Sequence, residues 1–222
     1  MDSVDLFRQE AHRLVDWIAD YYATIEKYPV KSAARPGSVY SAIPQTPPAD
    51  GEDMKCIFAD FESIIMPGIT HWQSPGFLAY FPANNSFPSI LAEMLTSALG
   101  AQCMKWETSP AATELEEAVM NWLKQMTGLP DHFEGVIQDT ASTSTLCAIL
   151  SAREKATAYQ VNNNGFGEQH VLRVYCSTEA HSSVEKAVKI AGIGRGNLVK
   201  VGTDREFRMV PAPIRVCGPM VQ

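Results

Sequence analysis

Short apolar runs alternate with helical patterns along the second half of the chain, and this alternation constrains the fold more than any other feature. Three runs are typical of strands, at residues 135–138, 171–176 and 198–201. A helical pattern with Leu146, Ile149 and Leu150 follows the first run, and another lies between the second and the third, at 182–191. Strands that alternate with helices indicate crossover connections, so the pattern predicts an α/β fold with a mainly parallel sheet.

Small hydroxyl residues occupy the turn where the first predicted strand, Gly135 to Gln138, enters its helix. The turn reads Asp-Thr-Ala-Ser-Thr-Ser-Thr over residues 139–145. The first N–H groups of a helix have no internal acceptor and lie at its positive end, so such a turn is suited to binding an anion. The same turn is equally explained by helix capping through Asp139, Thr140 or Ser142. The turn alone leaves both interpretations open.

A histidine, His181, follows the second predicted strand within the run Ala-His-Ser-Ser. Ligands of parallel sheets bind at the carboxyl ends of strands, where both the 139–142 turn and His181 are expected. A single histidine after a strand more often has a structural role. Its position still makes it a candidate site residue.

The composition narrows the class of protein. The chain has 222 residues, of which 45% are hydrophobic and 19% charged, as in globular proteins. Its net charge of −7 argues against nucleic acid or an anionic membrane as the main partner. No apolar run is long enough to cross a membrane, and the first residues lack a signal-peptide pattern. The five cysteines form no C-x-x-C pair, which predicts reduced thiols, no zinc site and a cytoplasmic protein.

The first 85 residues are predicted to be helical and extended. An apolar stripe with steps of three and four predicts one long helix, capped by Asp2 or Ser3 and formed by Val4, Phe7, Ala11, Leu14, Ile18, Tyr21 and Ile25. Such a stripe can face the core of its own chain or a second subunit. Residues 28–51 are rich in proline and are predicted to form an irregular connector. A second helix is predicted from Met54 to Ile65.

Aromatic residues are crowded among Pro and Gly from Thr70 to Pro82. They suit a rigid apolar wall of a pocket, and ordinary loop packing explains them as well. Two further helices are predicted, from about Pro88 to Leu99 with Gly100 as the stop, and from Pro110 to a stop at Gly128. The predicted division is 1–85, 86–209 and an atypical, proline-rich tail at 210–222.

Four motifs carry a resemblance to a known family: IIMPGITHWQSPGFLAYFPANNSFPS, WETSPAATELE, GVIQDTAS and AHSSVEKA. In this order they resemble the pyridoxal-phosphate-dependent group II amino-acid decarboxylases of the aromatic L-amino-acid type. The resemblance covers the chain to about Met209. It implies fold type I, with an N-terminal helical segment and part of a large, mainly parallel-sheet domain. It also implies pyridoxal 5′-phosphate as cofactor, an amino-acid substrate, and a homodimer whose N-terminal segment packs against the partner subunit.

The resemblance also implies roles for single residues. It assigns cofactor binding to Thr140, Ala141, Ser142 and His181, with His181 stacked on the cofactor ring and also catalytic. It assigns the substrate side chain to Trp72, Tyr80, Phe81, Pro82, Ala83 and Met104. Relatives commonly carry a threonine at Ala83 and an aromatic residue at Met104, so substrate selectivity does not carry over directly.

Two groups that the cofactor requires are not recognisable in the sequence. They are the acid opposite the pyridine nitrogen and the lysine of the Schiff base, since no His-Lys pair is present. The 222 residues alone are therefore predicted to be inactive, as the N-terminal portion of a decarboxylase of aromatic L-amino acids. Two alternatives stay open: a decarboxylase of another amino acid, such as glutamate, and a non-catalytic homologue that keeps only dimerisation surfaces. The aromatic residues at 72–81 favour an apolar substrate over an acidic one.

Overall fold

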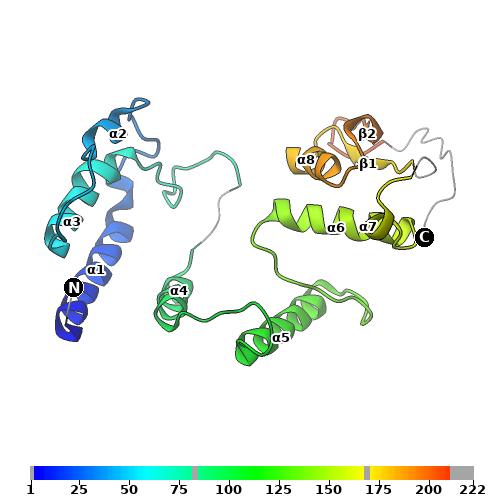
Figure 1. The fold of residues 1–222 in the computed structure, drawn as a ribbon. Helices are drawn as coiled ribbons and strands as arrows, with labels where there is room; N and C mark the ends of the chain where they lie inside the picture. The colour runs from blue at the N-terminus through cyan, green and yellow to red at the C-terminus, as the bar shows by residue number, and fades with distance from the viewer. Residues whose placement is uncertain (1–2, 82–84, 168–170, 211–222) are drawn as a thin grey trace. The chain divides into compact units, whose positions relative to one another are not determined.

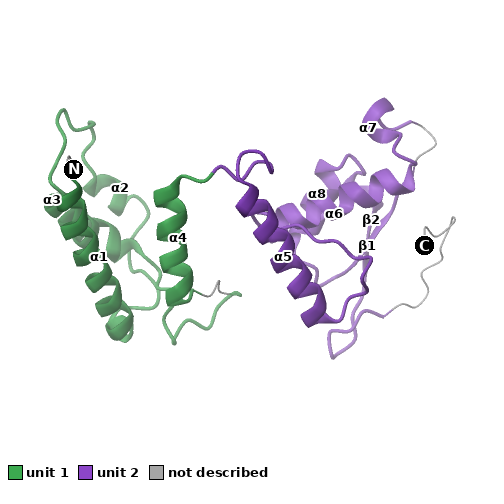
Figure 2. Cartoon of the chain, turned by 90° about the horizontal axis from the view of Figure 1, so that it is seen from below, with its two compact units in different colours: residues 1–101 green, residues 102–222 purple. Residues whose placement is uncertain are grey.

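The structure is a computed structural model that describes residues 3–81, 85–167 and 171–210. The chain forms two compact units, residues 1–101 and 102–222, which Figure 2 shows in separate colours. The predicted boundary at 85/86 falls inside the first unit. Most of the predicted tail at 210–222 lies outside the described residues.

Helix α1, Val4–Thr24, begins the first unit at the predicted residue, and the last residue of the predicted stripe, Ile25, lies in the following 3₁₀ turn, Ile25–Lys27. The Ser3 side chain caps it by accepting a hydrogen bond from the Leu6 N–H at 3.1 Å. Trp17 of α1 packs its indole edge-on against Phe58 and Phe61, with ring centroids 5.7 and 5.3 Å away. Both phenylalanines belong to the second predicted helix, which lies beside α1 in Figure 1.

The second predicted helix is α3, Met54–Asp60, continued by a π-helical turn at Phe61–Ile65 and a 3₁₀ turn at Met66–Gly68. The connector before it was predicted to be irregular, but it contains one short helix, α2, Ser38–Ala42. Gly37 precedes this helix in the left-handed region, with φ 87°, a conformation that glycine adopts without strain. The prediction missed this short helix because the prolines of the connector favour irregular structure.

Two helices end as their glycines predict. Helix α4, Phe87–Leu99, stops at Gly100 with φ 58°, and α5, Pro110–Thr127, stops at Gly128 with φ 67°. A left-handed glycine closes the last turn because it has no Cβ to clash with the preceding carbonyl. The beginnings differ: Ser86 caps α4 through its side chain, whereas Ser109 occupies the cap position of α5 without a side-chain cap bond.

The second unit contains a crossover between two parallel strands. Its elements are α6 (Ala141–Ala156), α7 (Val161–Asn164), β1 (Val174–Ser177), α8 (Ser182–Ile190) and β2 (Leu198–Val201). Strands β1 and β2 pair in parallel from Val174 opposite Leu198 to Ser177 opposite Val201, and α8 connects them (Figure 1). Around this pair Val188, Ala191 and Ile193 form a buried cluster, against which Ile149 and Leu150 of α6 pack.

The predicted buried strand at 135–138 is wrong in two respects. It makes no ladder with another strand among the described residues, and Val136 and Ile137 are 64% and 58% exposed. Its backbone is bound instead to α5, where the Glu116 carboxylate accepts the Ile137 N–H at 2.8 Å. An apolar run becomes a strand only where a neighbouring strand offers its backbone groups. In the part that the structure describes, β1 and β2 pair with each other and not with this segment.

Candidate functional site

Thr140 caps the helix that follows the hydroxyl-rich turn. Its side-chain oxygen accepts the Thr143 N–H at 3.2 Å, and its carbonyl accepts the Ser144 N–H at 3.0 Å. The cap is therefore Thr140, rather than Asp139 or Ser142. The Thr140 hydroxyl also lies 3.1 Å from the Thr143 hydroxyl. The Thr140 hydroxyl oxygen is thus held inside the protein by Thr143.

Ala141 and Ser142 offer donors to an incoming anion. They are the first two residues of α6, so their N–H groups have no acceptor within the helix, and both residues are exposed. The Ser142 hydroxyl adds a third donor, and the positive end of the helix dipole lies at the same place. These donors fit a phosphate group. The exposed carboxylate of Asp139, two residues before the helix begins, adds a negative charge that opposes an anion.

His181 caps helix α8 with its ring. The Nδ1 atom accepts the backbone N–H of Ser183 at 3.2 Å and lies 3.1 Å from the Ser183 hydroxyl. Because Nδ1 accepts a backbone donor, the neutral ring carries its proton on Nε2. The ring is thus fixed at one nitrogen, while the residue as a whole is exposed to solvent. The structural role that a single histidine after a strand suggested is therefore present.

The two candidate cofactor-binding positions lie at the same end of one helix pair. Helices α6 and α8 pack against each other. At their C-terminal ends the Arg153 guanidinium of α6 donates to the Ala191 carbonyl, just after α8, at 2.8 Å. Packed helices that meet at their C-terminal ends run in the same direction. The Thr140–Ser142 turn and His181 therefore both lie toward the N-terminal end of the pair.

This end of the pair is also the carboxyl edge of the two strands. The Thr178 N–H, directly after β1, donates to the Val201 carbonyl at the end of β2 at 2.9 Å. His181 follows Thr178 by three residues. Parallel sheets bind ligands at this edge, and His181 follows β1 there. The 135–138 segment does not contribute a strand there.

The aromatic residues of the 70–81 loop stack on one another in the first unit. The Trp72 ring is stacked with Phe77 at 4.6 Å and with Tyr80 at 5.7 Å between centroids. Tyr80 has a positive φ of 58°, which is uncommon for a residue other than glycine. Phe81 is 99% exposed, while Pro82 and Ala83 lie outside the described residues. The loop thus carries a stack of three rings.

Sequence reasoning missed His71, which precedes this stack. His71 is 2% exposed, and its Nδ1 lies 2.8 Å from the Tyr21 hydroxyl of α1. Burial lowers the pKa of His71, and burial also raises the pKa of Tyr21, with Tyr22 and Tyr28 adding to the rise. A histidine inside an aromatic run was the available signal, but the bond to a tyrosine fifty residues earlier has no local signature.

Met104 is 77% exposed in the loop before α5 and belongs to the second unit. Trp106 in the same loop donates its indole N–H to Glu114 at 3.0 Å. The candidate substrate residues Trp72, Tyr80 and Phe81 therefore belong to the first unit, and Met104 belongs with the cofactor candidates to the second. No set of three or more His, Cys, Asp or Glu among the described residues is placed to hold a metal ion.

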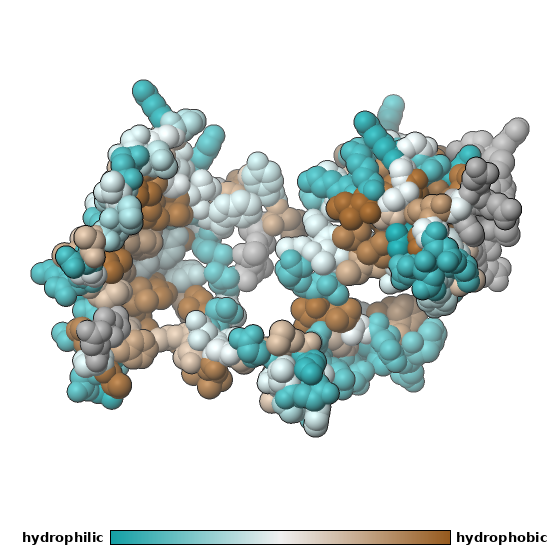
Figure 3. Space-filling model, viewed as in Figure 1, coloured by the Kyte–Doolittle hydropathy of each residue, from teal (hydrophilic) through white to brown (hydrophobic). Residues whose placement is uncertain are grey.

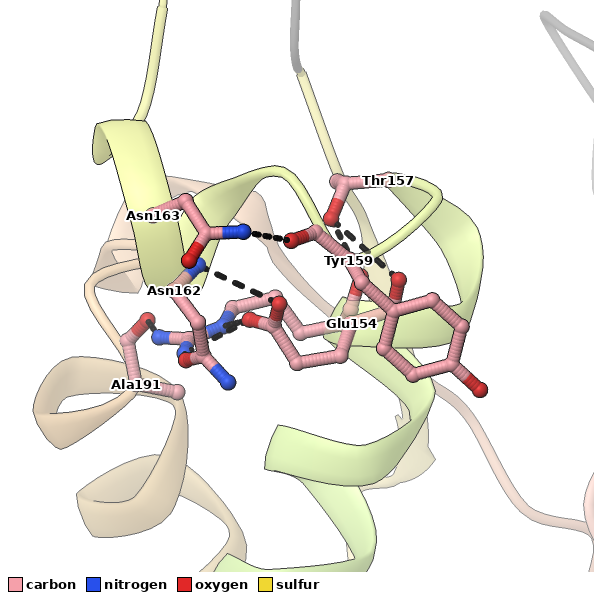
Figure 4. Close-up of polar contacts among 7 residues, drawn as sticks. Glu154, Thr157, Tyr159, Asn162, Asn163 and Ala191 are labelled. Atoms are coloured by element: carbon pink, nitrogen blue, oxygen red, sulfur yellow. Dashed lines mark hydrogen bonds and ion pairs between the residues drawn. The ribbon is translucent and has the colours of Figure 1, made fainter.

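A separate polar cluster, drawn in Figure 4, lies at the opposite end of α6. The Arg153 side chain donates to Glu154 at 2.9 Å and to Asn162 at 3.0 Å. The second oxygen of Glu154 accepts the Asn162 N–H at 3.2 Å. A cavity of about 400 Å³ beside them is lined by Leu150, Ser151, Arg153, Glu154, Tyr159 and Asn162. Because these polar atoms already have partners, the cluster reads as structural support of α6 and α7.

Comparisons with known proteins agree with these features. Residues 36–216 match the pyridoxal-dependent decarboxylase conserved domain. Tyrosine decarboxylase 4 of Petroselinum crispum is 39% identical over 213 residues, which cover 92% of this chain and 41% of that protein. Phenylacetaldehyde synthase of Petunia hybrida is 41% identical over 219 residues, covering 94% and 42%. The chain thus spans about two fifths of the length of these relatives.

A solved structure is similar over nearly the whole chain. The crystal structure of Catharanthus roseus tryptophan decarboxylase in complex with L-tryptophan superposes with a TM-score of 0.86 and 42% sequence identity. The match covers 94% of this chain and 44% of that one. The helices and the small parallel sheet described above therefore belong to a larger fold of type I. None of the described helices is long and apolar enough to cross a membrane.

Proposed function

Because the chain belongs to the pyridoxal-dependent decarboxylase family, we propose that it forms the N-terminal portion of an enzyme that decarboxylates an aromatic L-amino acid. The products are the corresponding amine and carbon dioxide. The observation that carries the proposal is the placement of the Ala141–Ser142 donors and His181 at one end of the α6–α8 pair. A phosphate seat and an exposed imidazole at the same end of the pair are what a phosphorylated aromatic cofactor needs.

The donor set gives each cofactor-binding residue a distinct role. The N–H groups of Ala141 and Ser142, with the Ser142 hydroxyl, would bind the phosphate, each charge-assisted bond contributing roughly 1.5–3 kcal/mol. His181 would support the ring of the cofactor, with its cap bond to Ser183 holding the imidazole in one orientation. When bound, pyridoxal 5′-phosphate supplies an electron-accepting ring that stabilises the charge left on Cα.

The aromatic stack of the first unit supports the choice of substrate class. Trp72, Phe77 and Tyr80 present flat apolar faces, and Tyr80 is 86% exposed. A glutamate-type substrate calls for a positive charge, and the stack offers none. We assign the substrate side chain to Trp72, Tyr80 and Phe81, with Pro82, Ala83 and Met104 as further contacts. We also propose a cytoplasmic homodimer, consistent with the free thiols of Cys56, Cys147 and Cys176.

The test uses the complete polypeptide that carries these residues. Carbon dioxide, amine, aldehyde and hydrogen peroxide are measured with tyrosine, tryptophan, dopa and glutamate as substrates. Amine formed in step with carbon dioxide from an aromatic substrate supports the proposal. Formation of aldehyde and hydrogen peroxide would instead indicate an aldehyde synthase, the activity for which the Petunia relative is named. Release from glutamate alone, or from no substrate by a cofactor-loaded enzyme, would overturn the proposal.

Residues 1–222 by themselves are expected to release no carbon dioxide. Borohydride reduction followed by peptide mapping checks this, because it fixes the cofactor on the lysine that holds it. One stoichiometrically labelled lysine within these residues, together with turnover, would contradict the expectation. Loose labelling of exposed lysines such as Lys186 would not. His181→Ala in the complete enzyme is expected to lower turnover much more than cofactor content, whereas normal turnover would return His181 to its capping role alone.

A further inference from the structure

The aromatic stack of Trp72, Phe77 and Tyr80 is attached to the rest of the first unit through the residue that precedes it. His71 is nearly fully buried, whereas Trp72 is 44% and Tyr80 86% exposed. Burial therefore constrains these two rings less than it constrains His71. Their position has to be set by the backbone that leads into the stack.

That backbone is bound on both sides of His71. The His71 N–H donates to the Val30 carbonyl at 2.9 Å, and the His71 carbonyl accepts the Ser74 N–H at 3.0 Å. Ser74, which is also buried, then accepts the Phe77 N–H on its own carbonyl at 2.9 Å. Two consecutive turns thus transmit the position of His71 to Phe77, whose ring stacks on Trp72.

The side chain of His71 is held by helix α1. Its Nδ1 shares a hydrogen bond of 2.8 Å with the Tyr21 hydroxyl, and its ring lies 4.9 Å from the Tyr28 ring between centroids. Tyr21 is in turn stacked at 5.6 Å on Trp17, whose indole N–H donates to Glu62 at 3.0 Å. A buried polar bond between two such side chains specifies one geometry, because breaking it leaves a buried group without its partner.

We propose that His71 is a positioning residue, and that its bond to Tyr21 sets the orientation of the Trp72–Phe77–Tyr80 stack from helix α1. The stack then presents a fixed flat surface to an aromatic side chain. Only this last statement, that the surface meets the substrate, rests on the proposed function. The orientation itself is a property of the first unit.

The test reads the Trp72 environment directly by ¹⁹F NMR of the full chain labelled with 5-fluorotryptophan, with Trp72→Phe used to assign its resonance. Tyr21→Phe removes only the hydroxyl, and His71→Phe removes both ring nitrogens. Both are expected to shift and broaden the Trp72 resonance. His71→Asn keeps a polar atom at the Nδ1 position and is expected to restore the parent resonance. Tyr22→Phe, on the same helix, is the matched control and is expected to leave Trp72 unchanged.

Two results would overturn the proposal. One is a Trp72 resonance that is unaffected by Tyr21→Phe and His71→Phe. The other is loss of the folded Trp17 resonance together with that of Trp72 in both variants, which would mean that His71 supports the whole unit rather than the stack. This readout needs no catalysis, so a polypeptide without decarboxylase activity would remove the proposed function and leave the positioning role standing.

A kinetic measurement tests whether the stack contacts the substrate. In the complete enzyme Tyr21→Phe is expected to raise KM for the aromatic substrate by about five- to tenfold with little change in kcat, because the stack binds the side chain equally in the ground and transition states. An unchanged KM combined with a shifted Trp72 resonance would contradict the substrate contact. It would leave the positioning of the stack intact.

Discussion

Helices α1 and α8 show opposite relations between length and burial. Helix α1 has 21 residues and buries none of them, whereas α8 has nine and buries Ser183, Ala187 and Val188. Both are amphipathic, so an apolar stripe alone does not determine burial. Helix α8 is buried because β1, β2 and α6 lie around it, while the stripe of α1 is only partly covered by α3. The comparison shows that burial is decided by the neighbours that the chain supplies.

The two units are consequently stabilised in different ways. The second unit has a small apolar cluster at Val188, Ala191 and Ile193. The first unit contains a set of aromatic ring contacts, in which Trp17, Tyr21 and Tyr28 lie around the buried His71. Helices α4 and α5, which the structure describes in full, bury no side chain. Figure 3 accordingly shows hydrophobic residues on the visible surface of both units.

The largest expected effect is that of a charge placed in the α8 cluster. Val188 has 0% exposure, so Val188→Asp buries a carboxylate without a partner and should cost about 3–5 kcal/mol in the free energy of unfolding. The matched control is Val4→Asp on α1, at 73% exposure in the first helical turn, where a negative charge is tolerated. Urea unfolding followed by circular dichroism measures both. Equal losses of unfolding free energy in the two variants would show that the difference in burial between α1 and α8 does not affect stability.

Removing one partner of a buried ion pair should have the next largest effect. Glu154 and Arg153 are paired at 2.8 Å with side chains 8% and 13% exposed. Glu154→Gln leaves the guanidinium without its counter-charge and should cost about 3 kcal/mol in unfolding free energy. Glu206→Gln is the control, because Glu206 and Arg208 pair at 3.0 Å with side chains about 70% exposed. A loss for Glu154→Gln no greater than that of the control would show that the cluster in Figure 4 does not anchor α6.

A smaller effect is expected at the N-terminal end of α6. Ser142→Ala in the complete enzyme removes one hydroxyl donor to the phosphate and should weaken cofactor affinity about tenfold. Ser144→Ala is the control, since Ser144 lies two residues further into the same helix and its N–H is already bound to Thr140. Cofactor titration by absorbance measures both dissociation constants. Unchanged affinity in Ser142→Ala would leave Ser142 without a role in the phosphate seat.

The smallest expected effect is a pH dependence confined to the first unit. Burial lowers the pKa of His71 in the folded state below its ordinary value of 6.5, so between these values the unfolded chain binds more protons. The contribution of neutral His71 is complete above pH 6.5 and decreases as the pH falls through the folded pKa. Tyr21 and Tyr28 are the titratable side chains that contact the ring, and burial raises the pKa of Tyr21, which keeps its hydroxyl neutral over this range.

The measurement compares urea midpoints at about pH 7.5 and about pH 5, followed by tryptophan fluorescence. His71→Asn should remove part of the decrease seen at the lower pH. His12→Asn, on the exposed surface of α1, serves as the control and should keep the parent's decrease. A decrease that is the same in all three proteins would show that His71 does not titrate across the folding transition.

The sequence by itself predicted the long helices, but it missed the short helix α2. Gly100 and Gly128 end helices as predicted, because a left-handed glycine is a local property of the chain. The sequence offered more than one N-cap for the helices that begin after Ser3 and Thr140, and the structure selected these two. The GVIQDTAS and AHSSVEKA motifs also identified the family. The placement of His181 after a strand followed from the alternation of elements.

The tertiary structure alone decided which apolar segments are covered and which polar side chains meet. Residues 135–138 have the composition of a strand, but the carboxylate of Glu116 binds their backbone in place of a neighbouring strand. The Tyr21–His71 bond joins residues far apart in sequence, and so does the packing of α6 on α8 that brings Ser142 and His181 to one end. Pairing and burial depend on partners that are distant along the chain, so no local pattern records them.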